Sequence, residues 1–311
     1  MSSLSTVVRR SVNTIGSKAR LALGAEAQVV TVILHTIYND MHDAQNPYVD
    51  TFQPFTTDQL DELITRATAD GYRFITPDEL CSDPPGDRLV LLTFDDGYFN
   101  NFNALPVLNS HEVPATFYIS AGHVRDGRSY WWDAMARAGA TLGWDQATLW
   151  SEDDRLKKLP YDEIEATIRE RFGDDALVPV GDLDRPMTPD ELVRFASDPC
   201  VVIGNHTVDH AILDVLDLDQ VQEQIQGCQQ LLHDWLGYAP TSIAYPNGNV
   251  NDAVAEVARS VGLTTGFSTE WGAEPLPLAA TRIMRVPRIP PTGASPIGYQ
   301  WQMMRAPGLR R

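Results

Sequence analysis

Short apolar runs alternate along the chain with segments in which apolar residues recur at helical spacing. The runs predict strands at residues 29–35, 88–94, 114–120, 201–205, 241–245 and 264–268. The helical spacing predicts helices over residues 57–69, 103–108, 218–236 and 251–261. Strands that alternate with helices predict a mostly parallel sheet with the helices packed outside it.

Two helix-start signatures and one interruption refine this pattern. Thr76 and Thr188 are each followed by Pro-Asp-Glu, a capping box with proline at the first helical position. Residues 143–187 are rich in Asp, Glu and Pro, and they predict a helical or loop insertion. We therefore expect residues 1–25 to form an N-terminal extension and residues 26–311 to form a single domain that carries the insertion.

Two adjacent carboxylates stand at the end of a predicted buried strand. Asp95 and Asp96 follow the apolar run at residues 89–92 almost directly and precede Gly97. Side chains alternate between the two faces of a strand, and an unpaired carboxylate is costly to bury. The pair therefore needs a compensating cation, either a metal ion or an arginine. A turn with one N-capping aspartate is the simpler alternative for this segment taken alone.

Two histidines follow another short apolar run, at residues 201–203. His206 and His210 are four residues apart, and on a helical turn such positions share a face, so both imidazoles can reach one ion. Two histidines and one carboxylate form a common set for a catalytic divalent metal. Two unrelated histidines are the alternative, but two polar motifs that both follow buried strands favour a shared site.

These motifs resemble those of a known family. Residues 93–97 (Thr-Phe-Asp-Asp-Gly) and 206–210 (His-Thr-Val-Asp-His) are similar to the first two signature motifs of the polysaccharide deacetylases, the NodB-homology or carbohydrate esterase family 4 enzymes. Residues 244–248 (Ala-Tyr-Pro-Asn-Gly) resemble the Tyr-Pro loop of one branch. The resemblance implies an α/β fold, a distorted (β/α)7-type barrel whose strand ends open on one catalytic face. The strand pattern alone leaves an open doubly wound sheet as the alternative.

The resemblance also implies roles for individual residues. Asp96, His206 and His210 match the metal ligands, and the implied cofactor is a divalent metal, zinc first, with cobalt, nickel or manganese as alternatives. Asp95 matches the general base that takes a proton from water. The backbone N–H of Tyr245 matches a donor that holds the oxyanion.

The chain departs from the family pattern at two positions. The usual late histidine is absent, and His35, at the end of the first predicted strand, is the candidate for an active-site role, with a core histidine as the alternative. The larger branch of the family carries an arginine just before the proline of the third motif, and Ala244 stands at that position here. Arg288, in a Val-Pro-Arg-Ile segment, is the candidate partner of Asp95, with a surface ion pair as the alternative.

Aromatic residues suggest where a sugar would bind. Trp131 and Trp132 can stack on sugar rings, Asp133 can bind hydroxyl groups, and Tyr245 and Asn247 of the third motif are further candidate substrate contacts. Packing in a core or a lid is the alternative for the two tryptophans. The implied partner is an N-acetylated sugar or glycan.

Composition narrows the location and the class of partner. A net charge of −18 argues against a nucleic-acid binder, and three widely spaced cysteines predict no disulfide framework. Residues 1–25 contain four basic residues and no acidic one, and they lack the apolar core of a secretory signal. We expect a cytoplasmic protein. Peripheral contact of this basic segment with an anionic membrane is one hypothesis, and a solvated or core-docked helix is the other.

The main hypothesis is a metal-dependent hydrolase that removes an N-acetyl group from an acetamido sugar or glycan with metal-activated water. Three alternatives remain open at this point: an O-acetyl esterase, a hydrolase of a non-sugar amide, and a non-catalytic carbohydrate-binding barrel.

Overall fold

The computed structural model describes residues 27–46, 49, 53–82, 86–291 and 295–306. The basic extension expected at residues 1–25 lies outside these residues. The strands are β1 (Gln28–Leu34), β2 (Arg73–Phe74), β3 (Arg88–Phe94), β4 (Ala115–Ile119), β5 (Val201–Asn205), β6 (Ser242–Ala244), β7 (Thr265–Phe267) and β8 (Glu274–Pro275). All six predicted strands are present, within one or two residues of their expected bounds.

The α-helices are α2 (Met41–Ala44), α3 (Thr57–Ala69), α4 (Pro77–Ser82), α5 (Leu105–His111), α6 (Ala121–Asp126), α7 (Trp131–Leu142), α8 (Gln146–Leu156), α9 (Tyr161–Phe172), α10 (Pro189–Ala196), α11 (Leu218–Leu236), α12 (Asp252–Ser260) and α13 (Ile297–Met304). Short 3₁₀ turns are η1 (Phe99–Ala104), η2 (Asp174–Leu177), η3 (Leu213–Val215) and η4 (Pro246–Gly248). Among the helices described here, none has the length and apolarity needed to cross a bilayer.

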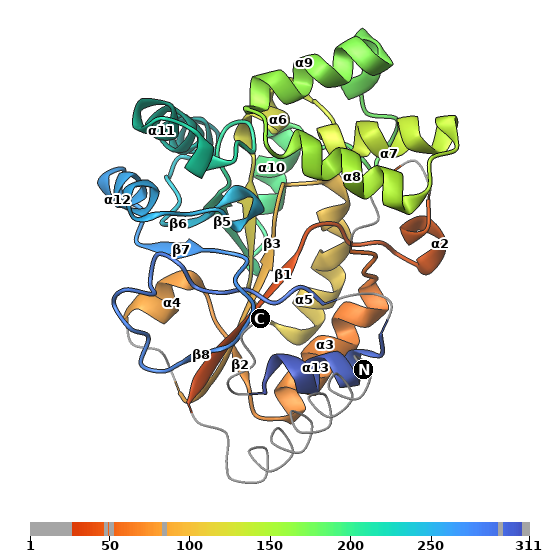
Figure 1. Ribbon diagram of the computed structural model, residues 1–311. Coiled ribbons are helices and arrows are strands. Elements are labelled where there is room, and N and C mark those ends of the chain that lie inside the picture. Colours follow the sequence, from red (N-terminus) through yellow and green to blue (C-terminus); the bar gives the residue numbers. More distant parts are fainter. Residues whose placement is uncertain (1–26, 47–48, 50–52, 83–85, 292–294, 307–311) are drawn as a thin grey trace, which may run out of the picture.

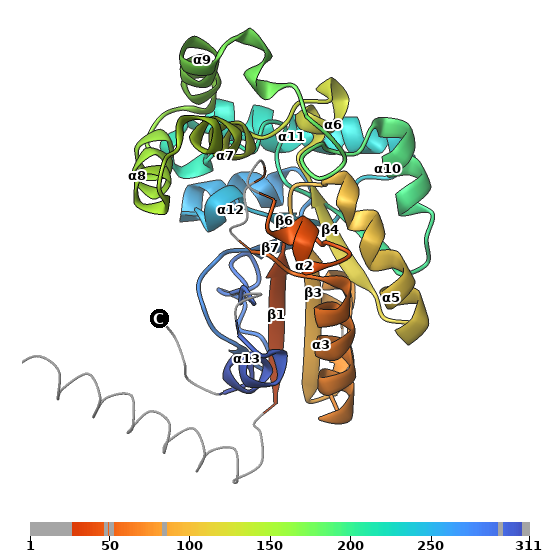
Figure 2. The same cartoon turned by 90° about the vertical axis from the view of Figure 1, so that its right-hand side faces the viewer.

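The sheet is curled and almost entirely parallel. Its order is β7-β6-β5-β4-β3-β1, with β8 antiparallel beside β1 and β2 parallel beside β3. Figure 1 shows the helices around this sheet, and in Figure 2 α3 and α5 run alongside β1 and β3. Residues of β3 from Leu89 to Phe94 are all buried, as expected for a parallel strand that is covered on both faces.

A short irregular segment closes the sheet into the distorted barrel that was predicted. Val286 forms a parallel bridge with Phe267 of β7, and Ile289 forms a parallel bridge with Val32 of β1. The segment therefore lies between the first and the last parallel strands. It carries Arg288, whose side chain is fully buried.

Helices α7, α8 and α9 form a separate layer above the carboxyl ends of the strands (Figures 1 and 2). Their apolar faces pack on one another in a cluster of their own, built around Trp131, Met135, Leu156, Ile164 and Ile168. Helices α8 and α9 fill most of the segment that was predicted to be inserted. The insertion thus forms a roof over the end of the barrel at which the polar motifs emerge.

Candidate active site

The polar motifs converge because they follow neighbouring parallel strands. Asp95 and Asp96 follow β3, His206 follows β5, and the Tyr-Pro loop follows β6. Both carboxylate residues are nearly inaccessible to solvent, at 2% and 1% exposure. Asp96 has a φ of +77°, in the left-handed region that non-glycine residues rarely occupy. Such a conformation is typical of a position that its surroundings hold for a function.

Asp96, His206 and His210 form a cluster with the geometry of a metal site. Their candidate ligand atoms all lie within 4.8 Å of one another. The Nε2 atoms of the two histidines lie 3.4 Å and 3.5 Å from Oδ1 of Asp96. The three residues predicted as ligands are therefore brought together from two separate strand ends.

The donor set fits a divalent cation. Oδ1 of Asp96 is buried and has no hydrogen-bond partner among the described residues. The Nδ1–H of His206 donates to the carbonyl oxygen of Ala244 at 2.7 Å, which fixes the ring with Nε2 toward Asp96. Burial lowers the pKa of His210 to about 3, so this ring is neutral at pH 7. A buried carboxylate and two imidazole nitrogens thus face one point, where a cation would satisfy them.

The environment of His206 is consistent with positive charge at this point. Burial lowers its pKa, but Asp95 and Asp96 together raise the pKa above its ordinary value. The two carboxylates therefore favour a cation beside this ring. A divalent metal would stand where that proton otherwise sits.

Asp95 is held by a buried arginine. Arg288 donates to both carboxylate oxygens of Asp95 at 2.7 Å, and its Nε donates to the carbonyl oxygen of Ser268 at 3.0 Å. The predicted pairing of Arg288 with Asp95 is confirmed. Burial alone would raise the pKa of Asp95, but Arg288 and then His206 outweigh it and lower the pKa below its ordinary value. Asp95 is ionised at neutral pH.

His35 lies at the same end of the barrel, after β1, and lines the cavity. The amide nitrogen of Gln53 donates to the carbonyl oxygens of Ile33 and Pro291, so its Oε1 accepts from Nδ1 of His35 at 2.9 Å. This contact fixes the tautomer with the proton on Nδ1, so that Nε2 is the ring nitrogen that can take up and release a second proton.

A single cavity of about 870 Å³ joins the strand ends to the helical roof. Its polar end holds the two aspartates and their partners. The wall toward the roof is largely aromatic, with contributions from Trp131, Trp132, Trp144 and Tyr161. Trp132 packs edge-on to His210 with 4.8 Å between ring centroids, so this wall reaches the candidate metal site.

Comparison with known proteins agrees with this site. The family model described as polysaccharide deacetylase matches residues 82–266, more than half of the chain. The chain belongs to this family. YxkH of Bacillus subtilis (strain 168), which bears the name of a polysaccharide deacetylase, is 24% identical over 241 residues. The match covers 76% of this chain and 66% of YxkH, so the chain spans just under two thirds of that relative.

Several solved structures share the fold, and two of the three described here are named as deacetylases. Streptococcus pyogenes deacetylase PplD, solved in complex with acetate, has a TM-score of 0.61 at 17% identity, and the match covers 90% of this chain and 99% of PplD. IcaB from Ammonifex degensii gives 0.58 at 19% identity, with 90% and 97% covered. The de-N-acetylase from Aggregatibacter actinomycetemcomitans gives 0.59 at 13%, with 88% and 99% covered. At these identities the likeness supports the distorted barrel.

The polysaccharide deacetylase motif around Tyr245 is arranged differently from our prediction. The N–H of Tyr245 donates to the carbonyl oxygen of Phe267 at 3.0 Å, within the β6–β7 pairing, and the side chain is buried in the core. The predicted oxyanion role of Tyr245 is therefore wrong, because its donor is already used. Asn247 of the same loop does line the cavity, with φ at +56°. Its N–H is not donated to any residue that the structure describes.

Of the other predicted sugar contacts, two line the cavity and one does not. Trp131 and Trp132 line the cavity of this deacetylase fold, as expected. Asp133 is buried away from it and accepts a hydrogen bond from the hydroxyl of Tyr98 at 2.7 Å, so its predicted contact with substrate is wrong. Sequence reasoning missed Tyr98 itself, which lines the cavity and also accepts from the indole N–H of Trp132 at 2.8 Å. Its position three residues after Asp95 was the available signal.

Proposed function

We propose that this chain is a metal-dependent hydrolase that removes an N-acetyl group from an acetamido sugar within a glycan. One observation supports this most directly. The cluster of Asp96, His206 and His210 stands beside an ionised Asp95 that Arg288 holds, and both groups face the same cavity. Membership of the polysaccharide deacetylase family favours the same chemistry.

Asp95 is the proposed general base. A divalent cation bound by Asp96, His206 and His210, with zinc as the first candidate, would polarise the substrate carbonyl and lower the pKa of a water molecule. Asp95 lies beside this cluster, with Oδ2 at 3.8 Å from Nε2 of His206, and can take a proton from the attacking water. Arg288 fixes the orientation of the Asp95 carboxylate through two parallel hydrogen bonds.

The remaining steps use two further residues of the cavity. The N–H of Asn247 is the proposed oxyanion donor in place of Tyr245, since a backbone donor is fixed in position before substrate binds. His35 is the proposed acid for the leaving nitrogen. Its ring is oriented by Gln53, so that Nε2 can deliver the proton.

An oligosaccharide segment fits the cavity better than a single sugar. A volume of about 870 Å³ lies near the upper end of the range of roughly 300–1,000 Å³ that is usual for small-molecule pockets. Trp132 and Trp144 are partly exposed and offer aromatic surface for stacking on sugar rings, whereas Trp131 is 4% exposed and packs mainly within the cluster of α7, α8 and α9. The name of the Aggregatibacter structure, a de-N-acetylase, favours an amide over an ester as the bond that is broken.

Acetate release tests this proposal. The metal-reconstituted protein is assayed with N-acetylated and O-acetylated oligosaccharides, with and without a chelator. Chelator-sensitive release from the N-acetylated series is expected. Release from the O-acetylated series alone would replace the amidase with an esterase, and the absence of both metal and release would favour a non-catalytic barrel.

Two variants separate the proposed roles. Asp96→Asn should lose metal and activity together, because it removes an anionic ligand. Asp95→Asn should keep the metal and lose turnover, because it removes only the base. Measured metal content and acetate release distinguish the two, and retained turnover in either variant contradicts the matching assignment.

A further inference from the structure

The turn that presents His210 is held in an unfavourable backbone conformation. Thr207 has a φ of +65° and His210 a φ of +55°, and both values lie in the left-handed region. A residue with a side chain is disfavoured there, because its Cβ approaches the following carbonyl oxygen. The geometry of His210 therefore depends on contacts that hold the turn from outside.

One side of the turn rests on helix α6. The N–H of Gly122 donates to the carbonyl oxygen of Val208 at 2.7 Å. A Cβ atom at Gly122 would stand 2.7 Å from that oxygen, so only glycine permits this approach. The N–H of Val208 in turn donates to the carbonyl oxygen of Gln224 in α11 at 3.1 Å.

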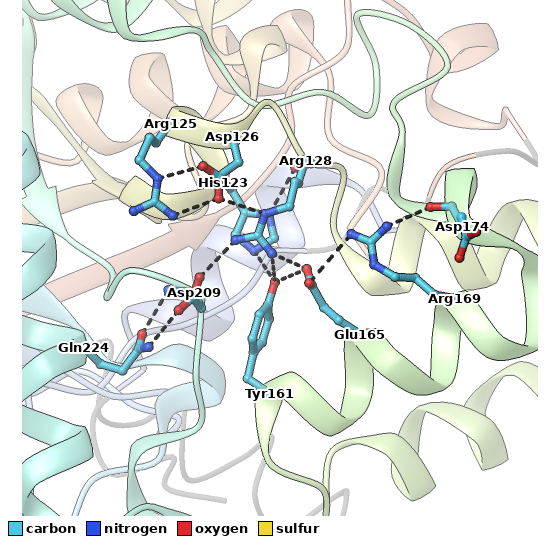
Figure 3. Close-up of polar contacts among 10 residues, drawn as sticks. All are labelled: His123, Arg125, Asp126, Arg128, Tyr161, Glu165, Arg169, Asp174, Asp209 and Gln224. Carbon is cyan, nitrogen blue, oxygen red and sulfur yellow. Dashed lines mark hydrogen bonds and ion pairs between the residues drawn. The ribbon is translucent and has the colours of Figure 1, made fainter.

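The other side is held through Asp209, the neighbour of His210. The side chain of Gln224 accepts from the N–H of Asp209 at 2.9 Å and donates to its Oδ2 at 2.8 Å. The remaining carboxylate oxygen accepts from Nη2 of Arg128 at 3.0 Å. Figure 3 shows Asp209 between Gln224 and Arg128. The carboxylate is thus fixed from two directions.

Arg128 also reaches helix α9 of the roof. Its Nη1 pairs with Glu165 and donates to the hydroxyl of Tyr161 at 3.2 Å, and that hydroxyl donates to Glu165 at 2.7 Å (Figure 3). Arg128 and Glu165 are largely buried, with side-chain exposures of 17% and 16%. One guanidinium therefore joins the roof to the turn that carries His210, and Tyr161 also lines the cavity.

A second set of contacts leads from the same cluster to Asp96. Nε2 of His123 lies 2.8 Å from the hydroxyl of Tyr161, and the His123 ring stacks on Tyr130 with 4.0 Å between centroids. The hydroxyl of Tyr130 donates to the backbone carbonyl of Asp96 at 2.6 Å. The Arg128 cluster is therefore packed against the segments of two of the three candidate metal ligands.

We propose that Arg128 is a positioning residue for His210: by clamping Asp209 against helix α9, it sets the conformation of the turn and with it the metal affinity of the site. This inference rests on the proposed metal-dependent function. A residue that only docked α9 onto the barrel would leave metal affinity unchanged. Outer contacts that orient metal ligands typically account for 10–100-fold in affinity.

Arg128→Gln tests the proposal directly, because charge alone and the positioning role predict opposite changes in metal affinity. Removing a positive charge near a cation site should, by charge alone, strengthen metal binding. The proposal predicts the opposite, because the released turn no longer presents His210. We expect the full-length variant to bind Zn²⁺ at least tenfold more weakly than wild type, measured by competition with a chromophoric chelator.

Arg169→Gln is the matched control. Arg169 lies on α9 and, like Arg128, pairs with Glu165, at 3.9 Å, but it makes no contact with Asp209 among the described residues. Its Zn²⁺ affinity should equal that of wild type. If Arg128→Gln fails to fold, Arg128→Lys decides the question. Lysine keeps the charge but lacks the planar fork that reaches Asp209 and Glu165 together, so weaker Zn²⁺ binding is again expected.

The Zn²⁺-binding experiment separates failure of the positioning role of Arg128 from failure of the proposed metal-dependent function. A wild-type chain that binds no Zn²⁺ contradicts the metal site itself. If the wild-type chain binds Zn²⁺ and Arg128→Gln binds it equally well or more tightly, only the positioning role is overturned. The same conclusion holds for Arg128→Lys where it replaces Arg128→Gln.

Discussion

Arg288→Met isolates the energetic role of the buried ion pair. The side chains of Arg288 and Asp95 are 0% and 3% exposed, and two hydrogen bonds of 2.7 Å join them. Removing the guanidinium leaves a carboxylate in the barrel without its counter-charge. Breaking a buried pair in this way costs about 3–5 kcal/mol. We therefore predict a loss of that size in the free energy of unfolding at pH 7.

The stability loss in Arg288→Met should also depend on pH, and the pKa of Asp95 in each protein sets the direction of this dependence. In the wild type the folded pKa of Asp95 is lowered, so its contribution to stability is present above the unfolded pKa of about 3.9 and is lost as pH falls through the folded value. In Arg288→Met, burial raises the folded pKa, so protonation on acidification removes the penalty. The difference between the two proteins should be largest at neutral pH and shrink toward about pH 4.

Urea unfolding followed by circular dichroism measures these differences. Arg259→Met is the matched control, because Arg259 pairs with Glu256 at 3.1 Å while both side chains are exposed, at 43% and 76%. It should cost at most about 1 kcal/mol. The double variant Asp95→Asn/Arg288→Met should recover part of the loss, since no unpaired charge remains buried. A loss below about 1 kcal/mol for Arg288→Met, with no change in m-value, would refute the reasoning.

Three further predictions follow from single contacts. Gly204→Ala should destabilise the fold by about 1–3 kcal/mol in the same urea assay, because a Cβ would stand 2.2 Å from the ring of Tyr118 on the neighbouring strand; an unchanged midpoint would contradict this packing. Trp132→Ala should raise KM for an oligosaccharide roughly tenfold, about 1.4 kcal/mol, with little change in kcat. His35→Ala should lower kcat by about 10²–10⁴-fold and leave bound Zn²⁺ unchanged, and an unaffected kcat would exclude His35 as the acid.

Local patterns in the sequence were sufficient for the strands and for placing the acidic and histidine motifs at one edge of the sheet, whereas the choice of Asp96, His206 and His210 as candidate metal ligands came from the resemblance to a family. Asp95, Asp96 and His206 each follow an apolar run, and in a parallel sheet the carboxyl ends of such runs meet at one edge. Helix α3 and helix α11 have the bounds that their spacing predicts. The pairing of Arg288 with Asp95 was also predicted, although the match to a family motif, rather than periodicity, pointed to it.

The wrong predictions named residues close to the cavity but misjudged where their hydrogen-bonding groups point. Tyr245 belongs to the loop that approaches the cavity, but a strand partner takes its N–H, and the next residues of the loop turn Asn247 toward the cavity instead. Asp133 is adjacent in sequence to two cavity tryptophans, but the periodicity of α7 places it on the buried side, where Tyr98 binds it. Which atoms of a loop are free depends on partners from distant segments.

Local periodicity and side-chain chemistry are enough to predict the order of strands and helices, the acidic and histidine motifs at strand ends, and the aromatic segment that begins α7. Three other features depend on packing between distant segments: residues 286–289 close the barrel, α7, α8 and α9 cover the cavity, and Arg128 joins these helices to the turn of His210. Arg128 and Asp209 are 81 residues apart, and their contact exists only once the chain has packed. Contacts between distant segments of this kind carry no local signal in a single sequence.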